Sequence, residues 1–334
     1  MTKKPLAVVI SDIHFNINTI ALASASMMAA ITKANELDVN LIVAGDMHDT
    51  KANMRGECVK AILEVITRCH KEPIIIVANH DRLNEKNPEH SLEFLRDKAR
   101  LITKIQHIPP FGFFIPYYHD PEELRRDLKL ISKGSRLIMH QGIAGSNSGE
   151  YIQDKSAITP NDVAGLRVIS GHYHCRQDIK LPDGGLWSYI GNPYTLNFAE
   201  ANDPEKGYQI LYDDGSLEFV PTNLRKHVAI MIEFRISIMS IKAIDSIMPD
   251  DLVKVTVKGN KEFINSMPRE TIEALLHLQQ SFKLDYVDTS TAPKLEATEG
   301  YKTPQVRLDE LIVASDFTDD RKERLKTLWR SMCD

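Results

Sequence analysis

Five short apolar runs, each followed at once by aspartate, asparagine or histidine, constrain the fold of this 334-residue chain more than any other feature. The runs are rich in valine and isoleucine and lie at residues 6–10, 41–44, 73–78, 136–139 and 166–170. Runs of this length and composition are typical of strands that are buried on both faces of a sheet. Two helical patterns, at residues 19–35 and 56–70, separate the first three runs. This alternation of strand and helix predicts an α/β fold.

Each predicted strand ends in a cluster of polar side chains. The clusters are Ser11-Asp12-Ile13-His14, Gly45-Asp46-Met47-His48-Asp49, Asn79-His80-Asp81, His140 and Gly171-His172-Tyr173-His174. In open α/β sheets, ligands collect at the carboxyl ends of the strands. We therefore expect side chains from all five strand ends to form one site.

The residue types at these ends are those of a dinuclear hydrolytic centre. Such a centre needs imidazoles and carboxylates, including one carboxylate that bridges two cations about 3.5–4 Å apart. Asp12 and His14 are separated by one residue, so both side chains lie on the same side of an extended segment. His172 and His174 have the same spacing. Asp46 follows a glycine, which permits the tight turn that exposes it, and is the expected bridge.

Any one of these motifs alone carries little weight. A single aspartate or histidine at a strand end is usually a cap or a solvated loop residue, and one His-x-His pair is a weak metal signal. Five such clusters in this order, each directly after a buried strand, are not independent accidents. The expected metal ligands are Asp12, His14, Asp46, Asn79, His140, His172 and His174.

The sequence pattern changes after residue 177. Asp183-Gly184 and Asp214-Gly215 are typical of hairpin turns. Alternating runs at residues 228–236 and 252–257 then indicate strands of a separate α+β domain.

Helical patterns complete that domain and the end of the chain. They lie near residues 269–280 and 308–314, and a last amphipathic pattern covers residues 319–332. We expect a main domain at residues 1–225, a smaller capping domain at 226–317, and a C-terminal amphipathic segment at 318–334 that docks on the chain's own second domain or on a partner.

Charge and cysteine content narrow the class of protein. The 41 lysines and arginines and the 46 aspartates and glutamates give a net charge of −5. The chain has no basic tail of the kind that would indicate nucleic-acid binding. No apolar run approaches the ~18 residues of a membrane span. The N-terminal apolar run ends at Ile10, too early for a secretory signal. The four cysteines have no disulfide-framework spacing, so we expect a cytoplasmic protein that does not enter a membrane.

The order of the five clusters resembles that of the calcineurin-like metallophosphoesterases. The resemblance covers about residues 6–225 and implies a two-sheet sandwich flanked by helices. It also implies two cation sites that share Asp46. One site would contain Asp12, His14, Asp46 and His174, and the other Asp46, Asn79, His140 and His172.

The same resemblance implies roles for three further residues. His80 would act as a general acid toward the departing oxygen, or stabilise the charge that grows there, after in-line attack by water. Asp81 would orient His80, and Asp49 would support the ligands from behind. One position departs from the family pattern, because Ala78 stands where the family usually has glycine.

Several later segments are similar to SbcD-type DNA repair nucleases, including phage relatives. The main one, residues 188–200, has the Gly-Asn-Pro sequence of that family's corresponding segment, and residues 206–208, 218–222 and 46–51 are also similar. Cellular members often have histidine where Asp49 stands. The resemblance implies a DNA exonuclease and endonuclease that acts in DNA repair and recombination. It implies further that the enzyme uses two divalent cations, which are expected to be manganese. It also implies a homodimer and an SbcC-type coiled-coil ATPase partner.

Two other classes of function stay open on the sequence. The first is a calcineurin-like phosphatase or phosphodiesterase that acts on a small molecule or a protein. The second is a scaffold that kept the fold and lost the metals. The complete set of ligands argues against the scaffold, and residues 188–200 together with the added domain argue against the small-molecule enzyme.

Overall fold

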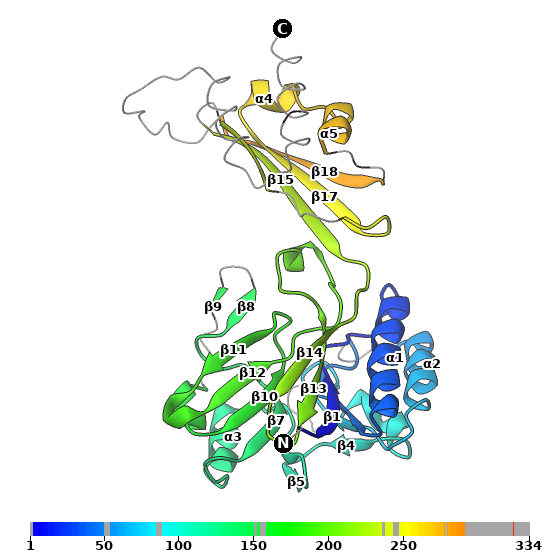
Figure 1. The fold of residues 1–334 in the computed structure, drawn as a ribbon, viewed down its shortest axis with the longest axis vertical. Coiled ribbons are helices and arrows are strands. Elements are labelled where there is room, and N and C mark those ends of the chain that lie inside the picture. The colour runs from blue at the N-terminus through cyan, green and yellow to red at the C-terminus, as the bar shows by residue number, and fades with distance from the viewer. Residues whose placement is uncertain are drawn as a thin grey trace. The chain divides into compact units, whose positions relative to one another are not determined.

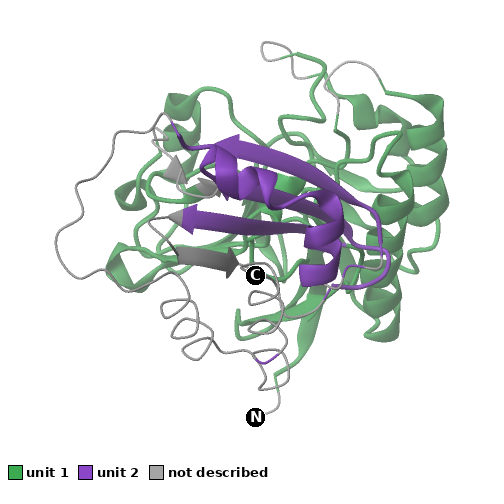
Figure 2. Cartoon of the chain, turned by 90° about the horizontal axis from the view of Figure 1, so that it is seen from above, with its two compact units in different colours: residues 1–225 green, residues 226–334 purple. Residues whose placement is uncertain are grey.

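The computed structural model describes residues 3–49, 54–84, 89–149, 152–153, 158–235, 238–242, 247–276, 278, 280–290 and 323. The chain divides into two compact units, Met1–Arg225 and Lys226–Asp334, which Figure 2 shows in green and purple.

The first sheet of the first unit has six strands (Figure 1). In spatial order they are β14 (Leu217–Pro221), β13 (Gly207–Tyr212), β1 (Pro5–Ile10), β2 (Asn40–Val43), β3 (Ile74–Ile76) and β4 (Arg100–Ile102). β1 to β4 are parallel, as expected for strands joined by helical crossovers. β13 is antiparallel to β1, and it forms a hairpin with β14 at the predicted Asp214-Gly215 turn.

The second sheet also has six strands. In spatial order they are β11 (Gln177–Lys180), β12 (Leu186–Tyr189), β10 (Arg167–Gly171), β7 (Arg136–His140), β6 (Gly112–Ile115) and β5 (Gln106–Ile108). The four central strands are parallel, and the two edge strands are antiparallel to their neighbours. β11 and β12 are joined through the predicted Asp183-Gly184 turn.

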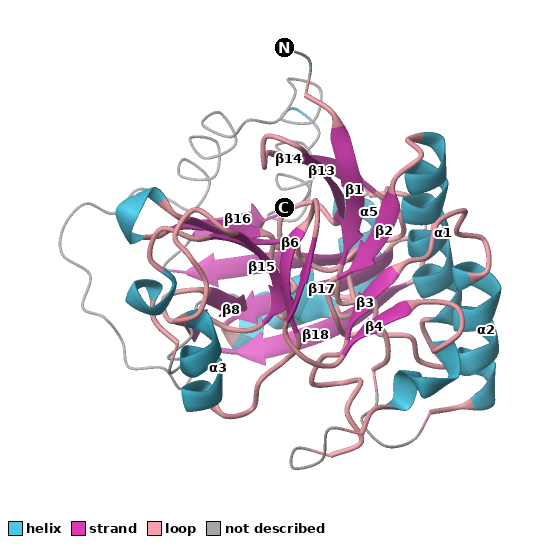
Figure 3. Ribbon diagram, turned by 90° about the horizontal axis from the view of Figure 1, so that it is seen from below, coloured by secondary structure: helices cyan, strands magenta, loops and turns pink. Residues whose placement is uncertain are grey.

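Helices cover the outer faces of the two sheets. α1 (Ile20–Glu36) and α2 (Gly56–Ile66) lie side by side against β1 and β2 (Figure 3) and share one apolar core with them. The apolar face of α2 packs into this core through Ile62 and Ile66. α3 (Pro121–Leu128), which Asp120 caps through the N–H of Glu122, packs on the second sheet.

A third apolar cluster lies between the sheets. It joins Val9 and Ile42 of the first sheet to Ile138 and Ile169 of the second, and all four are buried. Because successive side chains of a strand point to opposite faces, every central strand contributes both to this layer and to a helix-covered face. The expected two-sheet sandwich flanked by helices is therefore confirmed.

The second unit is built on a smaller sheet. Its strands are, in spatial order, β16 (Ile238–Lys242), β15 (His227–Arg235), β17 (Leu252–Gly259) and β18 (Phe282–Asp288). α4 (Lys261–Asn265) and α5 (Arg269–Leu276) connect β17 to the parallel strand β18 and bury Phe263 and Ile272. This is the expected α+β arrangement. The helices predicted at 308–314 and 319–332 lie outside the described residues, apart from Glu323.

No helix in the described parts of either unit is long and apolar enough to cross a bilayer.

Candidate metal centre

The loops that follow β1 and β2 run alongside each other and are tied by backbone hydrogen bonds. The N–H of Asp12 donates to the carbonyl of Gly45, and the N–H of His14 donates to the carbonyl of Asp46, both at 3.1 Å. The strand pairing of the first sheet therefore continues into the loops that carry the predicted ligands. Ser11 adds a further bond, from its hydroxyl to the carbonyl of Ala44 at 3.0 Å.

Four of the predicted ligands have left-handed backbone conformations. Their φ angles are 53° for Asp12, 50° for His14, 50° for Asp46 and 95° for His172. A non-glycine residue in a sparsely populated conformation costs roughly 1–3 kcal/mol, and such residues persist where the surrounding structure holds them. Aspartate and histidine tolerate this region better than most residues do. Asp38, Asp183 and Asn223 also have positive φ, but within the described residues only in these loops do several such residues converge, which makes the loops a candidate functional site.

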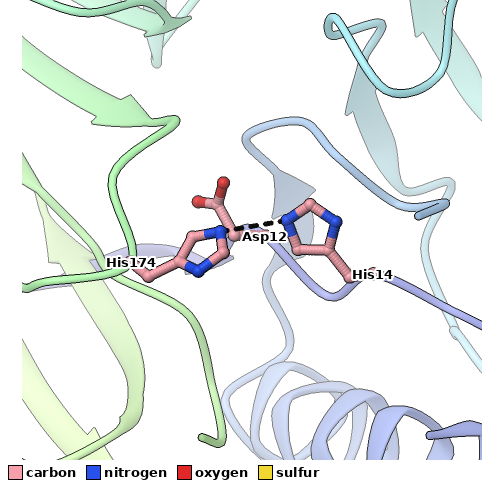
Figure 4. A group of neighbouring side chains, drawn as sticks. All are labelled: Asp12, His14 and His174. Atoms are coloured by element: carbon pink, nitrogen blue, oxygen red, sulfur yellow. Dashed lines mark hydrogen bonds between the residues drawn. The ribbon is translucent and has the colours of Figure 1, made fainter. Parts of the chain in front are cut away.

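Asp12, His14 and His174 form the first group of side chains that converge (Figure 4). Their nearest ligand atoms all lie within 4.8 Å of one another, and His14 Nε2 is 3.1 Å from His174 Nε2. Two imidazole nitrogens at this distance cannot both carry a proton, because an N–H would then point at another N–H. The three residues are members of the first cation site that the sequence resemblance implies.

Asp46, His140 and Asp12 form a second group. His140 Nδ1–H donates to the carbonyl of Ala44 at 2.8 Å, which turns Nε2 toward Asp46 Oδ2 at 3.2 Å. Burial alone would lower the pKa of His140, but the carboxylates of Asp46 and Asp12 outweigh burial and raise that pKa to about 9. Burial also opposes ionisation of Asp46. The neighbouring His140 outweighs burial and holds the pKa of the Asp46 carboxyl far below its usual range. The group therefore favours a positive charge beside Asp46.

His80 joins His14 and Asp46 in a third group. Its backbone N–H donates to Asp46 Oδ1 at 3.0 Å. Its Nδ1 lies 2.6 Å from the carbonyl oxygen of Asp49 and must donate, since a carbonyl oxygen only accepts. Nε2 is then the basic nitrogen of the neutral ring. This placement is compatible both with metal ligation and with proton transfer by His80.

His172 lies beside the second group, and Asn79 directly precedes His80 of the third group in the sequence. The His172 ring centroid is 5.2 Å from that of His140, and the backbone N–H of His172 donates to the two carboxylate oxygens of Asp12 at 3.1 and 3.2 Å. Burial and the nearby His140 lower the pKa of His172 to about 4, so its imidazole is neutral and able to bind a cation. Tyr117, which the sequence analysis did not single out, lies against His172 at a centroid distance of 5.9 Å.

Three buried polar atoms of the centre form no hydrogen bond: His14 Nδ1, Asn79 Oδ1 and His140 Nε2. His14 Nδ1 and His140 Nε2 each have a carboxylate oxygen nearby, at 3.4 Å in Asp49 and 3.2 Å in Asp46. Most buried polar atoms in proteins are paired, so each of these requires an explanation. An amide oxygen, imidazole nitrogens and carboxylate oxygens are together a donor set for divalent cations such as manganese, iron or zinc. The residues present therefore fit a metal centre.

Asp81 and Asp49 contact the backbone and side chains that carry the predicted ligands. Both oxygens of the buried Asp81 accept backbone N–H bonds, from His48 at 3.1 Å and from Ala78 at 3.0 Å. Asp81 thus fixes the backbone on either side of the site, and its proposed effect on the His80 ring stays a prediction. Burial, with Asp46 nearby, raises the pKa of Asp81 to about 7. Asp49 Oδ1 lies 3.4 Å from His14 Nδ1.

Glu200 is the clearest contributor that the sequence analysis missed. Its Oε1 is 2.7 Å from His174 Nδ1, so it fixes the ring with Nε2 directed to the centre. Its Oε2 accepts from Asn192 Nδ2 at 2.9 Å and from the Leu196 N–H at 3.0 Å. Burial would raise the pKa of Glu200, but the bonds from His174 and Lys206 outweigh it and lower that pKa to about 2.

The segments that resemble SbcD-type nucleases meet in this network. Lys206 Nζ donates to the carbonyl of His174 at 3.0 Å and to Asn192 Oδ1 at 2.5 Å. The Tyr194 hydroxyl donates to the carbonyl of Ile13, between Asp12 and His14, at 2.6 Å. Thr222 Oγ1 bonds the carbonyl of Pro193. The motifs contained the signal for Glu200 and Lys206, but only the fold shows which ligand they support.

Two strand ends require glycine because a larger residue would clash with neighbouring side chains. A Cβ on Gly171 would lie 1.9 Å from Ser11 Oγ, and one on Gly45 would lie 2.3 Å from His140 Nδ1. Ala78, which replaces the usual glycine, is absent from the described residues with positive φ, so its side chain meets no backbone penalty.

Comparison with known proteins adds little to this description. No protein-family model matches the sequence, and no curated protein matches it. Among solved structures, a dimetal phosphatase from Danio rerio is similar, with 10% sequence identity and a TM-score of 0.37, over 63% of this chain and 93% of that one. A likeness of this degree assigns no activity, so the chemistry of this chain follows from its own residues.

Proposed function

We propose that this chain is a metal-dependent phosphoesterase that hydrolyses phosphodiester bonds in DNA. The observation that supports it most is the convergence of three overlapping Asp/His groups on loops with left-handed backbone, next to buried polar atoms that lack partners. A structural role would not require strained ligands and unpaired atoms at the same place.

The ligand sets are those that the sequence resemblance implies: Asp12, His14 and His174 would hold one cation, and His140, Asn79 and His172 the other, with Asp46 between them. The convergence of the first three residues and the contact of Asp46 with His140 support these sets. When bound, a pair of divalent cations lowers the pKa of water and stabilises negative charge on phosphoryl oxygens. Asp46 Oδ2 lies 3.8 Å from His14 Nε2 and 3.2 Å from His140 Nε2, between one residue of each proposed set, which supports a bridging role.

His80 is the residue proposed to manage the proton. The bond from Nδ1 to the Asp49 carbonyl leaves Nε2 to hold a proton near the leaving oxygen of a phosphoester. The bond from its backbone N–H to Asp46 Oδ1 holds the His80 backbone next to the proposed bridging carboxylate. Asp49 and Asp81 act on this region through His14 and through the loop backbone, respectively.

DNA as the substrate is supported by the segments that resemble SbcD-type nucleases. Residues 188–200, 206–208 and 218–222 form one hydrogen-bonded support for His174 and Ile13, which lie in earlier parts of the chain. Shared supports of this kind fix the shape of a centre and its access. The same resemblance supports manganese as the cation.

The proposal extends to the assembly. We propose that the nuclease acts as a homodimer and with an SbcC-type coiled-coil ATPase, which residues 318–334 would contact through an amphipathic helix. That segment lies outside the described residues apart from Glu323, and the apolar stripe in its sequence supports the docking role. Titration of the ATPase subunit with full-length chain and with a chain that ends at residue 317 tests it, and equal affinities would rule the docking role out.

One assay decides the substrate. Purified protein with manganese is incubated with duplex DNA, single-stranded DNA, bis-p-nitrophenyl phosphate and p-nitrophenyl phosphate, each with and without EDTA. We expect EDTA-sensitive cleavage of DNA and of the diester. Cleavage of the monoester with no action on any DNA would assign the chain to the small-substrate phosphatases, and no activity on any substrate would favour a scaffold.

A further inference from the structure

A second polar site lies in the first unit, between the two sheets. It is a pocket of about 640 Å³, within the size range of small-molecule sites. Its walls come from β7, β10, β11 and β12 of one sheet and from β13 and β14 of the other. Three arginines line it, Arg136, Arg167 and Arg176, together with one carboxylate, Asp178.

Arg136 and Arg167 are neighbours that face the same way. They are direct partners in the pairing of β7 with β10, just as Ile138 partners Ile169. The two isoleucines belong to the apolar cluster between the sheets, so by the two-residue period of a strand both arginines also face the opposite sheet. Like charges directly opposite each other on neighbouring strands are destabilising. Burial and Arg167 together lower the pKa of Arg136, as expected for an unfavourable pair.

Among the residues that the structure describes, the hydrogen bonds of these two side chains leave most of their donors free. Arg136 donates to the carbonyls of Phe111 at 3.3 Å and Asp213 at 3.4 Å, and Arg167 donates to the carbonyl of Asp214 at 3.2 Å. A guanidinium has five N–H donors. Both groups converge, because a Cβ built on Gly215 would be 3.0 Å from Arg167 Nη1 and 3.4 Å from Arg136 Nη2.

Acidic side chains near the pocket offset the charge of the arginines only in part: Asp213 and Asp214 attract Arg136, and Asp214 attracts Arg167, but burial and Arg167 still lower the pKa of Arg136. Within the described residues, none of the three guanidiniums forms an ion pair with a carboxylate. The carboxylate of Asp213 accepts the backbone N–H groups of Lys4 and Asp214, and that of Asp214 accepts the N–H of Ser216. Asp178, on the exposed edge strand β11, is the one acidic residue in the lining.

Two further polar atoms of the lining are buried without a partner. They are Arg176 Nε and Ser216 Oγ. The Arg176 guanidinium is held over the Phe219 ring, 4.0 Å from its centroid, which fixes its plane. A fixed guanidinium with an unused donor is well suited to an anion with several acceptor oxygens.

We propose that this pocket binds the phosphate group of a small phosphorylated molecule through Arg136, Arg167 and Arg176, with Ser216 as an additional donor. Arginine matches phosphate geometry and binds it with paired hydrogen bonds. A bound dianion removes the repulsion between Arg136 and Arg167 and pairs the buried donors. The pocket is separate from the metal centre, since Arg136 lies at the amino end of β7 and His140 at its carboxyl end, about 13 Å away at ~3.3 Å per residue.

The test measures binding by the full-length chain with the metal centre silenced. Isothermal titration in EDTA uses three probes: inorganic phosphate, adenosine 5′-monophosphate and uncharged adenosine. EDTA removes phosphate binding that depends on bound cations, so the proposal does not rest on the phosphoesterase assignment. Saturable binding of either phosphate-bearing probe, with none of adenosine, supports the site. Tighter binding of the nucleotide shows that the ligand is a phosphomonoester, and equal binding shows that it is free phosphate.

Variants locate the binding. Arg167→Gln and Arg176→Gln are expected to weaken it by about tenfold or more, because each removes a charge-assisted hydrogen bond. Arg126→Gln, on the exposed surface of α3, removes the same charge and is expected to leave binding unchanged. Ser216→Ala, a mild change, keeps the test valid if an arginine variant fails to fold. No saturable binding by the native chain, or equal loss in Arg126→Gln, would overturn the proposal.

Discussion

The two ends of β7 and β10 differ in the charge of the ion that they suit. Along the face that looks toward the opposite sheet, β7 reads Arg136, Ile138 and His140, and β10 reads Arg167, Ile169 and Gly171. The carboxyl ends lie at a centre of carboxylates and imidazoles that suits cations. The amino ends hold an arginine pair that suits an anion. One apolar layer separates the two sites.

This difference shows how a single sheet face accommodates two incompatible polar clusters. The period of two places every second residue on the face, so five residues give two polar ends around one buried isoleucine. At the carboxyl end, strained loops and unpaired atoms add to the polar side chains. At the amino end, the backbone is regular and only the side chains carry the charge. The two ends can therefore be altered independently.

The largest expected effect comes from removing the shared carboxylate at the carboxyl end. Asp46→Ala should abolish hydrolysis and weaken metal binding by more than about 100-fold, since even residues that only support ligands typically contribute ~10–100-fold. Elemental analysis and the DNA assay on the same preparation measure both quantities. Full metal content in this variant would contradict the bridging assignment.

Asp38→Ala is the matched control for that variant. Asp38 also has a left-handed backbone, with φ of 52°, but its exposed side chain contacts Lys71 outside the centre. The two variants share the cost of placing alanine at positive φ. Asp38→Ala should keep both metal and activity, so any loss specific to Asp46→Ala belongs to its carboxylate.

His80→Ala is expected to have the next largest effect. If His80 assists the leaving group, turnover should fall by ~10²–10⁴-fold while the metal content is unchanged. His107→Ala, at an exposed histidine of β5, is the control and should behave as the native chain. Loss of metal from His80→Ala would instead make His80 a ligand, which its position beside His14 and Asp46 also allows.

Glu200→Gln should have a smaller effect. It should lower the affinity of the centre for metal but leave all the metal ligands in place. It replaces the charged partner of His174 Nδ1 and is expected to weaken metal binding by ~10–100-fold. Glu218→Gln, at an exposed glutamate of β14, leaves the network intact and should have no effect. Metal titration of the two variants measures the difference. Equal affinities would show that Glu200 serves the packing of residues 188–200 alone.

The sequence predicted the regular parts of this unit better than their ends. Five continuous apolar runs located β1, β2, β3, β7 and β10, because strands buried on both faces need such runs. The third run was predicted to extend to residue 78, but β3 ends at Ile76. The Val77 N–H bonds the carbonyl of Ile102 and the Ala78 N–H bonds Asp81, so neither continues the pairing with β2.

Short strands, the end of one helix and contacts between distant segments could not be predicted from local sequence patterns. β4, β5 and β6 have three or four residues each, too few to show a period. The helix predicted at 56–70 ends at Ile66, where the Thr67 N–H and hydroxyl both bond the Leu63 carbonyl. The predicted ligand groups could be named because each follows a strand. Glu200 and the arginine pair depend on contacts between distant segments, which composition and spacing do not reveal.

The smallest expected effect tests the amino ends of β7 and β10 directly. In a double-mutant cycle of Arg136→Gln and Arg167→Gln, each single change relieves the repulsion between the guanidiniums, and the second change relieves nothing further. Without ligand, the double variant should therefore lose more free energy of unfolding than the sum of the single changes, by roughly 0.2–1 kcal/mol. Urea unfolding is followed by tryptophan fluorescence in a Trp329→Phe background, so that the signal comes from Trp187, which is buried in this unit. With inorganic phosphate present, the native chain alone should gain the full stabilisation from both arginines, so the coupling energy should shrink or change sign.

A coupling energy that is absent without phosphate, or that phosphate does not change, would contradict the proposal. The two arginines would then only stabilise the turn at Asp213 and Asp214. The two ends of the strands would differ in charge, but the amino ends would bind no ligand.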